Sequence, residues 1–296
     1  MNATLPLSIG ILCWRNTASL ARALQSYAVG GLFDAARQTR LFLPEPTRDG
    51  ILLGRRYGLD VRTAPNNPSL LENFARLAEG LDSEWILLLE DDCPLIEDAE
   101  TTKTNLRIGL DLLMSGQAQA VRLRHRTFPG AARRFQTLDK SRRYHPPPGS
   151  SSGRRSLAMT RRVLRPGKAR RMLVGLPYED ADPQADPHLL AAGSGPPRRI
   201  PNRPSDEWLA KQYPDVFRII DGILLGSTEI VPWSNQSVLV GKSFYLEEVI
   251  ARARSREAAH QTRAANIEAQ LNRKAWRRSG WWIGLPEGLF AHELCT

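Results

Sequence analysis

Three adjacent acidic residues, Glu90-Asp91-Asp92, follow the short apolar segment that begins at Trp85. The segment has the length of a strand and no polar alternation, which predicts a strand buried on both faces of a parallel sheet. The acids then lie at the carboxyl end of a central strand, where open α/β sheets bind their ligands. Neighbouring carboxylates repel one another, and a divalent metal carrying a phosphate would relieve the repulsion because hard cations take oxygen ligands. The alternative interpretation is a solvated acidic turn that caps the next helix.

The segments around this strand alternate between strand patterns and helix patterns. Strands are predicted over 7–14, 39–44, 59–63, 85–90 and 118–123, and helices after Asn16 or Thr17, after Asn67-Pro68, and over 102–114. Alternation of this kind predicts an α/β fold with a doubly wound, mostly parallel sheet.

The regular pattern fails after residue 123. Residues 124–204 contain a Pro/Gly/Ser-rich stretch at 146–153 and another at 193–204, so they are interpreted as a long, irregular insertion. Order is predicted to return with a short helix at 205–211, a strand at 216–225 and a long helix over 246–275. We therefore expect one composite domain with an α/β half at 1–123, the insertion at 124–204 and a second half at 205–296.

Composition limits the class of protein. The chain has 296 residues and 42% hydrophobic residues, which is typical of a globular protein, and no apolar stretch approaches the roughly 20 residues of a membrane span. The N-terminus lacks a basic region, so it is interpreted as the lead-in to a strand rather than a signal peptide. Three cysteines, far apart and odd in number, predict neither a disulfide framework nor a metal site, and this fits a reducing cytoplasm.

The positive charge is concentrated in one segment. The net charge is +10, and residues 122–171 contain 16 Lys or Arg residues and a single acid, Asp139. A basic balance confined to one segment indicates an anionic partner, such as an anionic glycan, a pyrophosphate-linked lipid, an anionic membrane surface or nucleic acid. The alternative is a basic surface loop without a partner.

Four features of the sequence resemble the GT-A fold of glycosyltransferases, in particular the large family 2-like group. They are the opening strand and helix with Ser8-Ile-Gly-Ile-Leu, Leu20 and Leu24-Gln-Ser-Tyr27, the pair Asn73 and Leu77 before the acidic strand, the D-x-D-like motif Glu90-Asp91-Asp92, and the C-terminal segment Gly288-Leu-Phe-Ala-His292. The resemblance covers residues 1–123 well, residues 205–296 thinly and residues 124–204 not at all. The motif departs from the family pattern because its outer members are Glu and Asp rather than two Asp.

This resemblance implies a divalent metal that offsets the charge developing on a nucleotide diphosphate leaving group. Asp92 is the first expected metal ligand, and Glu90 or Asp91 would contact the ribose or complete the metal shell. His292 is the second expected protein ligand, with a surface histidine on a fraying tail as the alternative. An imidazole ligand favours Mn²⁺, and Mg²⁺ is the second choice.

The resemblance also implies a general base near the acceptor hydroxyl, because the transfer is expected to be inverting. Glu268 is one candidate, and the alternative for it is an exposed acid paired along its helix with Arg263 or Arg273. Asp206 and Glu207 are the others, although acids in the first turn of a helix also complement the helix dipole.

The expected donor contacts are Glu45 after the second strand, together with Asn73, Glu90 and Asp91. A carboxylate such as that of Glu45 can accept from a base N–H or a ribose hydroxyl. Trp276, Trp281 and Trp282 are interpreted first as packing residues and second as a platform for an acceptor sugar.

The sequence therefore predicts a metal-assisted glycosyltransferase that moves a sugar from a nucleotide-diphosphate donor, with a UDP-sugar favoured, to an anionic glycan or a lipid-linked acceptor. It would be cytoplasmic, or peripheral at the inner face of a membrane through residues 122–171. A nucleotidyltransferase is the second enzymatic reading, but the loop after the first strand lacks a glycine-rich phosphate cradle. A basic nucleic-acid-binding protein is the third, and nucleic acid is not the expected partner because the basic segment contains few aromatic residues and no recognised binding motif.

Overall fold

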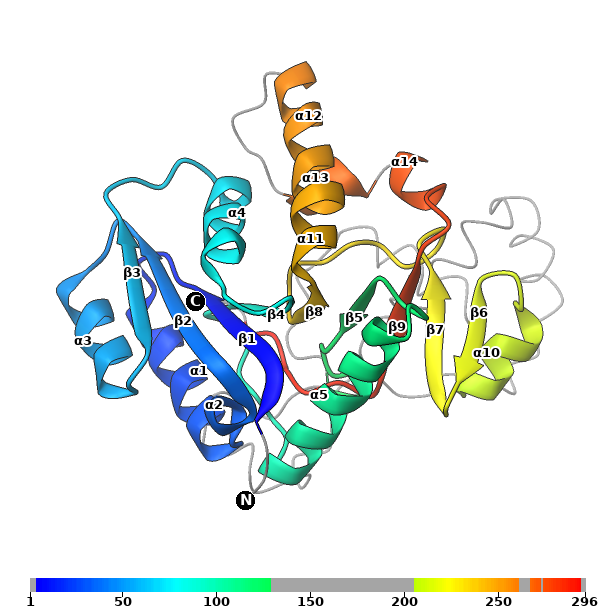
Figure 1. Cartoon of the computed structure of the whole chain (residues 1–296), viewed down its shortest axis with the longest axis horizontal. Helices are drawn as coiled ribbons and strands as arrows, with labels where there is room; N and C mark the ends of the chain where they lie inside the picture. Colours follow the sequence, from blue (N-terminus) through cyan, green and yellow to red (C-terminus); the bar gives the residue numbers. More distant parts are fainter. Residues whose placement is uncertain (1–3, 129–204, 261–266, 273, 294–296) are drawn as a thin grey trace, which may run out of the picture.

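A computed structural model describes residues 4–128, 205–260, 267–272 and 274–293. The first part of the chain alternates between strands and helices, as the sequence predicts (Figure 1). Its elements are β1 (Leu5–Leu12), α1 (Thr17–Val29), α2 (Leu32–Ala35), β2 (Ala36–Pro44), α3 (Arg48–Arg56), β3 (Asp60–Ala64), α4 (Leu70–Gly80), β4 (Trp85–Glu90), α5 (Ala99–Met114) and β5 (Ala120–Arg122).

The second part adds shorter strands and a helical segment. Its elements are α10 (Asp206–Gln212), β6 (Phe217–Ile220), β7 (Ile223–Ser227), β8 (Val238–Gly241), α11 (Lys242–Phe244), the π-helix η1 (Tyr245–Ile250), α12 (Ala251–His260), α13 (Ile267–Leu271), α14 (Lys274–Arg277) and β9 (Trp282–Leu285). Among the described helices, none is long and apolar enough to cross a membrane.

The described strands form one mixed sheet in the order β3-β2-β1-β4-β8-β5-β9-β7-β6. The first four strands in that order are parallel, which confirms the α/β class and the parallel sheet expected for residues 1–123. Strand β8 then lies antiparallel between β4 and β5. The carboxyl ends of β4 and β5 therefore flank the beginning of β8, so residues before β8 join that edge of the sheet.

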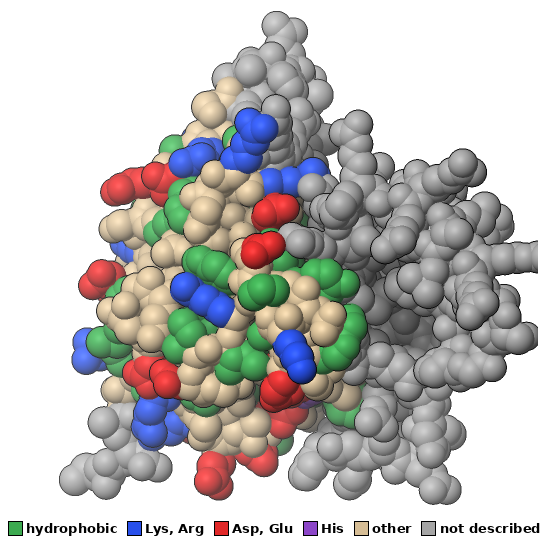
Figure 2. All heavy atoms as spheres, turned by 90° about the vertical axis from the view of Figure 1, so that its right-hand side faces the viewer, with side chains coloured by type: hydrophobic (Ala, Val, Ile, Leu, Met, Phe, Trp, Pro, Cys, Tyr) green, Lys and Arg blue, Asp and Glu red, His purple; other side chains and the backbone are tan. Residues whose placement is uncertain are grey.

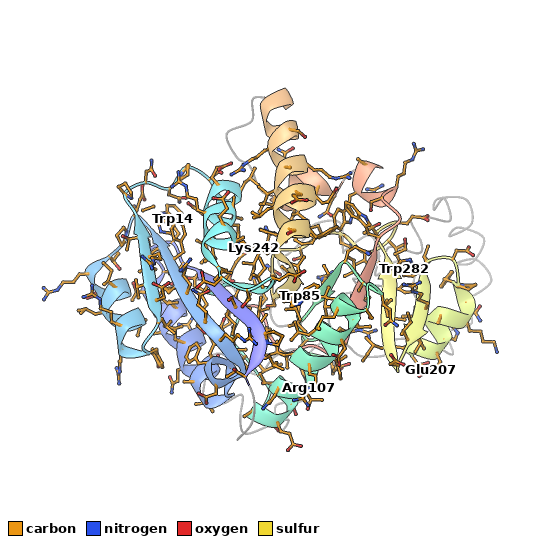
Figure 3. All side chains as sticks on the ribbon, viewed as in Figure 1. Trp14, Trp85, Arg107, Glu207, Lys242 and Trp282 are labelled. Carbon is orange, nitrogen blue, oxygen red and sulfur yellow. The ribbon has the colours of Figure 1, made fainter. Side chains whose placement is uncertain are left out.

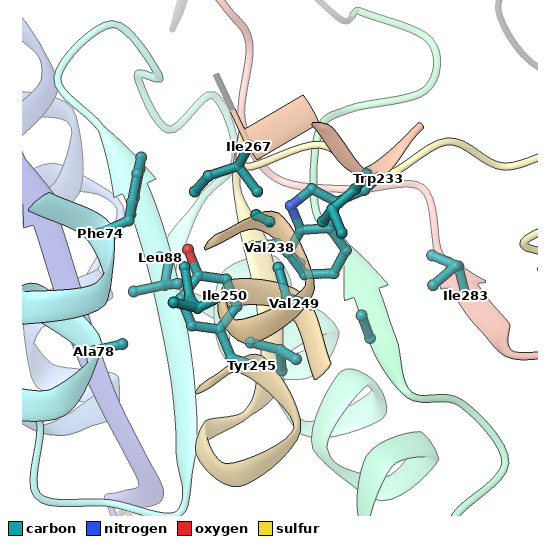
Figure 4. Close-up of a cluster of buried hydrophobic side chains, with 14 of the residues drawn as sticks. Phe74, Ala78, Leu88, Trp233, Val238, Tyr245, Val249, Ile250, Ile267 and Ile283 are labelled. Carbon is teal, nitrogen blue, oxygen red and sulfur yellow. The ribbon is translucent and has the colours of Figure 1, made fainter. Parts of the chain in front are cut away.

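Helices cover both faces of the sheet, and the side chains of β4 show why its sequence is apolar throughout. Leu87 and Leu89 pack in the core under α1 and α5, whereas Ile86 and Leu88 pack in the core under α4 and η1. Figure 4 shows the second core, where Leu88 lies between Phe74 of α4 and Tyr245 of η1. A strand with both faces buried needs apolar residues at every position, and its first polar residue marks where it leaves the core.

The structure corrects two predicted elements. The segment 216–225 is a hairpin of β6 and β7 rather than one strand, because Asp221 and Gly222 both have positive φ (49° and 77°) and form a tight turn. The predicted helix over 246–275 begins as the π-helix η1 rather than as an α-helix, and its other described residues include α12, α13 and the start of α14, while residues 261–266 and 273 lie outside the described part of the chain. Helices α3 and α2 and strands β8 and β9 were not predicted.

The hairpin forms one end of the molecule together with α10. Figure 2 shows this end, where hydrophobic, acidic and basic side chains are interspersed over the described residues. Most of the basic segment 122–171 lies outside the described residues, so its predicted insertion remains a prediction.

Candidate active site at the carboxyl end of β4

The backbone places the three acids at the edge of the sheet, beside the end of β1. Glu90 is the last residue of β4 and pairs with Leu12, and the N–H of Asp91 donates to the Leu12 carbonyl (3.1 Å). The N–H of Cys93 then donates to the carbonyl of Glu90 (3.3 Å), which closes a turn. All three acids are partly exposed, so a ligand in solution can reach them.

Asp92 contacts His292 directly. Nε2 of His292 lies 3.1 Å from Oδ2 of Asp92, although the two residues are 200 positions apart. Burial raises the pKa of Asp92, but the hydrogen bond and charge of His292, together with hydrogen bonds from Cys93 and the backbone, outweigh burial and leave the pKa lowered. The geometry therefore unites the two residues that the sequence analysis expected to bind a metal.

The C-terminal segment that carries His292 is built into the fold rather than fraying. Phe290 lies between the loop after β4 and the end of β5, forming isolated bridges with Leu95 and Arg124. The ring of Phe290 packs edge to face on Tyr27, with 5.9 Å between ring centroids. His292 is only 5% exposed. The alternative of a surface histidine on a fraying tail is therefore wrong.

An ion pair holds the end of this segment against α1. Arg22 donates from Nε and Nη2 to Oε2 of Glu293, at 3.0 Å in each case. The backbone N–H of Glu293 also donates to the carbonyl of Asp92 (2.8 Å). These contacts fix His292 relative to the acids through its neighbour in the chain.

Asp91 is in a different environment from Asp92. Burial and the negative charge of Asp92 raise the pKa of Asp91 to about 7, against a weaker opposing effect from hydrogen bonds, including one from Cys13. Its Oδ2 atom is buried and has no hydrogen-bond partner. A buried carboxylate oxygen without a partner is suited to a cation or a hydroxyl supplied by a ligand.

The donor atoms at this edge fit a divalent metal that shares its shell with a ligand. Within the described residues, no three His, Cys, Asp or Glu side chains form a group that could hold a metal by themselves. An octahedral ion with ligands at about 2.1 Å has adjacent ligands about 3 Å apart, close to the 3.1 Å between His292 and Asp92. Mg²⁺-like ions commonly use one or two protein ligands and take the rest from water and phosphate.

Glu45 lies beside the loop after β1, where it organises a second group of exposed side chains. Its Oε2 accepts from the indole N–H of Trp14 (3.1 Å) and pairs with Nη2 of Arg15 (2.9 Å). Glu45 and Arg15 both have positive φ, 50° and 60°, which is a strained conformation for residues other than glycine. Trp14 is 52% exposed, so its ring is available at the same edge of the sheet as the acids.

Asn73 lies deeper than its expected role requires. It is buried on α4, and its Nδ2 donates to Oδ1 of Asn67 (2.5 Å) in the loop that precedes the helix. The hydrogen bond thus holds Asn73 against that loop.

Glu90 lies close enough to the buried Tyr245 to affect its phenol group. Burial raises the pKa of Tyr245, and the negative charge of Glu90 raises it further.

Glu268 supports the segment before β8. Its Oε1 accepts from the hydroxyl of Ser234 (2.8 Å) and from the N–H of Asn235 (3.2 Å). Val238, which opens β8, pairs with Leu88 near the end of β4. Glu268 thus contacts the segment that leads into β8, and its side chain is partly exposed.

Asp206 and Glu207 have structural surroundings that differ from those of Glu268. Asp206 forms a two-pronged ion pair with Arg126, at 2.8 Å and 2.6 Å. Arg126 also donates to the carbonyl of Leu285 (2.9 Å). Glu207 is exposed on α10, and Figure 3 shows it far from Trp14, which marks the edge with the acids.

The three tryptophans considered as an acceptor platform pack in the core or against arginines. Trp276 is buried and donates from its indole N–H to the carbonyl of Val231 (3.1 Å). Arg252 lies over the ring of Trp281 at 4.8 Å, and Arg218 over Trp282 at 4.2 Å. These contacts support the packing interpretation.

Sequence reasoning missed four site residues: Trp14, Arg22, Arg124 and Glu293. Trp14 and Glu293 each stand next to a predicted feature, one at the end of the first strand and one after His292. Their positions next to those features could have indicated Trp14 and Glu293 as site residues. Arg124 likewise follows the strand predicted over 118–123, whereas nothing local in the sequence indicates Arg22.

Comparisons with known proteins found similarity only among solved structures. No protein-family model matches the sequence, and no characterised protein matches it. Several of the similar structures are glycosyltransferases. Glucosyl-3-phosphoglycerate synthase from Mycobacterium tuberculosis, solved with Mn²⁺ and UDP-glucose, is 14% identical with a TM-score of 0.32 over 39% of this chain and 42% of that one.

Two further solved structures match at the same level. TarS from S. aureus is 12% identical, with a TM-score of 0.36 over 44% of this chain and 38% of that chain. A mannosyltransferase from Pyrobaculum calidifontis, solved with GDP-Man and Mn²⁺, is 10% identical, with a TM-score of 0.35 over 42% of this chain and 37% of that chain. The matched region thus spans about two fifths of these structures.

Proposed function

We propose that this protein transfers a sugar from a nucleotide-diphosphate donor, with a UDP-sugar favoured, to a hydroxyl of its acceptor. The observation that carries the proposal is the contact between Asp92 and His292 at the carboxyl end of β4, beside the buried oxygen of Asp91. An acidic edge that includes an imidazole and an orphan carboxylate oxygen suits a divalent cation bound together with a phosphate.

Asp92 and His292 would hold the metal, with Mn²⁺ favoured over Mg²⁺. A metal held there would supply positive charge to offset the negative charge that develops on a leaving diphosphate. The contribution of the protein is to fix both ligands before the donor binds. Arg22, Glu293 and the buried Phe290 provide that support.

The nucleoside part of the donor would lie against the loop after β1. Trp14 offers an exposed ring for the base, and the carboxylate of Glu45, oriented by Trp14 and Arg15, can accept from a base N–H or a ribose hydroxyl. Glu90 or Asp91 would contact the ribose. Asn73, buried on α4, would act by supporting the loop that contains Asn67.

Glu268 is the proposed general base, and transfer would then proceed with inversion. Its carboxylate would accept the proton of the acceptor hydroxyl as that oxygen attacks the sugar carbon from the side opposite the leaving group. Ser234 and Asn235 hold one oxygen of this carboxylate, which orients the side chain. Asp206 is less suited because its carboxylate forms the ion pair with Arg126, and Glu207 is exposed away from the acids.

The acceptor is proposed to be an anionic glycan or a lipid-linked molecule. The support is the sequence of 122–171, whose concentrated positive charge would attract such an acceptor or the anionic membrane surface that carries it.

A screen of nucleotide-sugar hydrolysis and transfer, run with Mn²⁺ and with EDTA, tests the proposed function. We expect release of a nucleoside diphosphate from at least one donor, dependent on the metal and lost in Asp92→Asn. A purified, folded protein that turns over none of a panel of UDP-, GDP- and dTDP-sugars with any acceptor fraction would contradict the proposal.

A further inference from the structure

Arg124 is a basic residue at the same edge of the sheet as the acids. It follows β5 by two residues, and its guanidinium donates from Nη1 to Oε1 of Gln236 (2.9 Å) in the segment before β8. Both side chains are partly exposed. Arg124 therefore combines a fixed position in the fold with access to solvent.

The backbone at Arg124 is held more firmly than a loop residue usually is. Phe290 forms a bridge with it, and the N–H of Leu123 donates to the carbonyl of Ser237 (2.8 Å). Gly288 approaches so closely that an added Cβ would lie 2.5 Å from the carbonyl oxygen of Arg124. The segment that carries His292 and the segment that carries Arg124 are thus in direct contact.

The guanidinium lies within electrostatic range of Cys93, the residue that follows Asp92. Burial raises the pKa of the Cys93 thiol, the charges of Asp92 and Glu90 raise it further, and the charge of Arg124 acts in the opposite direction. Only β8 separates β4 from β5 in the sheet, so the carboxyl ends of β4 and β5 are about 10 Å apart. A long arginine side chain and a diphosphate can bridge much of that distance.

We propose that Arg124, oriented by Gln236, binds the diphosphate of the donor as a second cationic group beside the Asp92–His292 pair. This inference rests on the proposed function and names the residue that contacts the leaving group. A guanidinium has a planar fork of N–H donors that matches the spacing of phosphate oxygens. Arg124 is accordingly a catalytic residue that strengthens its contact as charge moves onto the diphosphate.

Calorimetric titration with UDP, inorganic pyrophosphate and uridine, each with Mn²⁺, tests the inference. The titrations compare the wild type with Arg124→Gln, with Arg124→Lys and with the control variant Arg107→Gln. Arg107 is exposed on α5, and Figure 3 shows it well apart from Trp14, so its substitution removes the same charge elsewhere. Pyrophosphate has no base, so it reports on phosphate binding whichever nucleotide the donor carries.

We expect Arg124→Gln to weaken UDP and pyrophosphate at least tenfold and to leave uridine unchanged. The affinities of Arg124→Lys for UDP and pyrophosphate should fall between those of the wild type and Arg124→Gln, because lysine keeps the positive charge and loses the planar guanidinium. Arg107→Gln should bind all three compounds like the wild type. Equal UDP and pyrophosphate affinities in the wild type and Arg124→Gln, with both folded, would overturn the inference while leaving the proposed function standing. A wild-type protein that binds neither UDP nor pyrophosphate would instead overturn the proposed function, and this inference with it.

A further titration separates the donor from a phosphorylated acceptor. Glycerol 3-phosphate is added to protein saturated with UDP and Mn²⁺. If Arg124→Gln loses glycerol 3-phosphate binding but keeps UDP affinity, Arg124 serves an acceptor phosphate and the assignment to the donor is overturned. Unchanged glycerol 3-phosphate binding, together with weakened UDP binding, supports the assignment.

Discussion

Asp91 and Asp92 are adjacent, yet their surroundings change their acidity in opposite directions. His292 lowers the pKa of Asp92 despite its burial. Burial and the charge of Asp92 raise the pKa of Asp91 to about 7. One carboxylate is thus already compensated by the protein, whereas the other is costly to ionise until a cation arrives.

Asp91→Asn should change how stability depends on pH. The folded pKa of Asp91, about 7, is above the unfolded value of about 3.9, so the folded state binds more protons between these values and stability falls as pH rises. We expect Asp91→Asn, without metal, to gain at least about 2 °C in melting temperature over the wild type between pH 5 and pH 8. A difference between the two proteins that stays constant across this pH range would show that Asp91 ionises normally.

Glu268→Gln should remove the chemistry and retain the structure. Glutamine keeps an oxygen that can accept from Ser234 and Asn235, so the segment before β8 should stay in place. We expect kcat to fall by roughly a hundredfold or more, the usual range for a lost general base, with UDP affinity within about twofold of the wild type.

Glu207→Gln is the matched control for that variant, because Glu207 is exposed and far from the acids. It should turn over like the wild type. If Glu268→Gln keeps a near-normal kcat, the base must be sought elsewhere, beginning with Asp206.

At the level of elements, the C-terminal segment is the part of the fold that completes the site. It contributes His292 and Glu293, and it contacts both the loop after β4 and the end of β5. Gly288 makes this path possible, because its φ of 96° and its contact with the Arg124 carbonyl leave no room for a side chain.

Gly288→Ala should therefore destabilise the protein and weaken Mn²⁺-dependent binding of UDP together. We expect a loss of roughly 2 kcal/mol or more, from backbone strain and the displaced Arg124 backbone. Gly222→Ala is the control, because Gly222 also has positive φ (77°) but has nothing within 4 Å of an added Cβ. Thermal melting and calorimetry measure both effects, and equal behaviour of the two variants would mean that the close approach of Gly288 is unimportant.

The sequence predicts those elements whose signal is local. The apolar run of β4, the Asn16 cap of α1 and the acids at the end of β4 are visible in single windows of sequence. The cap of α4 is Ser69 rather than the predicted Asn67, and α4 begins at Leu70 rather than at Pro68. Strands β8 and β9 have only four residues each, and their identity depends on pairing with β4 and β5, which lie far away in the chain. Helix α3 contains two glycines, which hide its pattern.

The site residues, too, could be predicted only where their signal is local in the sequence. Asp92 and His292 were predicted from motifs, but the ion pairs of Arg22 with Glu293 and of Arg126 with Asp206 join residues 271 and 80 positions apart. No local pattern encodes such pairs, because each partner is an ordinary charged residue on its own element. Tertiary contacts therefore decide which acids remain available for chemistry.

For the whole molecule, the uneven distribution of charge is the main feature that the site does not explain. Residues 122–171 contain 16 basic residues and one acid, whereas the rest of the chain is net negative. Each cation near an anionic membrane surface contributes about 1 kcal/mol of attraction, which fades as salt screens it.

Co-sedimentation with anionic and neutral vesicles tests a role for this charge. The wild type is compared with a variant in which six arginines of the segment become glutamine: Arg142, Arg143, Arg154, Arg155, Arg161 and Arg162. We expect the wild type to sediment with anionic vesicles at low salt and the variant to stay in solution. Equal sedimentation of both, or indifference to lipid charge, would leave a soluble anionic glycan as the proposed acceptor.

Calorimetric titration of UDP in the presence and absence of Mn²⁺, for the wild type and Asp92→Asn, tests the central claim most directly. Asparagine keeps the shape of Asp92 and removes the charge that the contact with His292 organises. We expect Mn²⁺ to strengthen UDP binding at least tenfold in the wild type and to have little effect in a folded Asp92→Asn protein. The same enhancement by Mn²⁺ in both proteins would show that Asp92 does not bind the metal and would contradict the account.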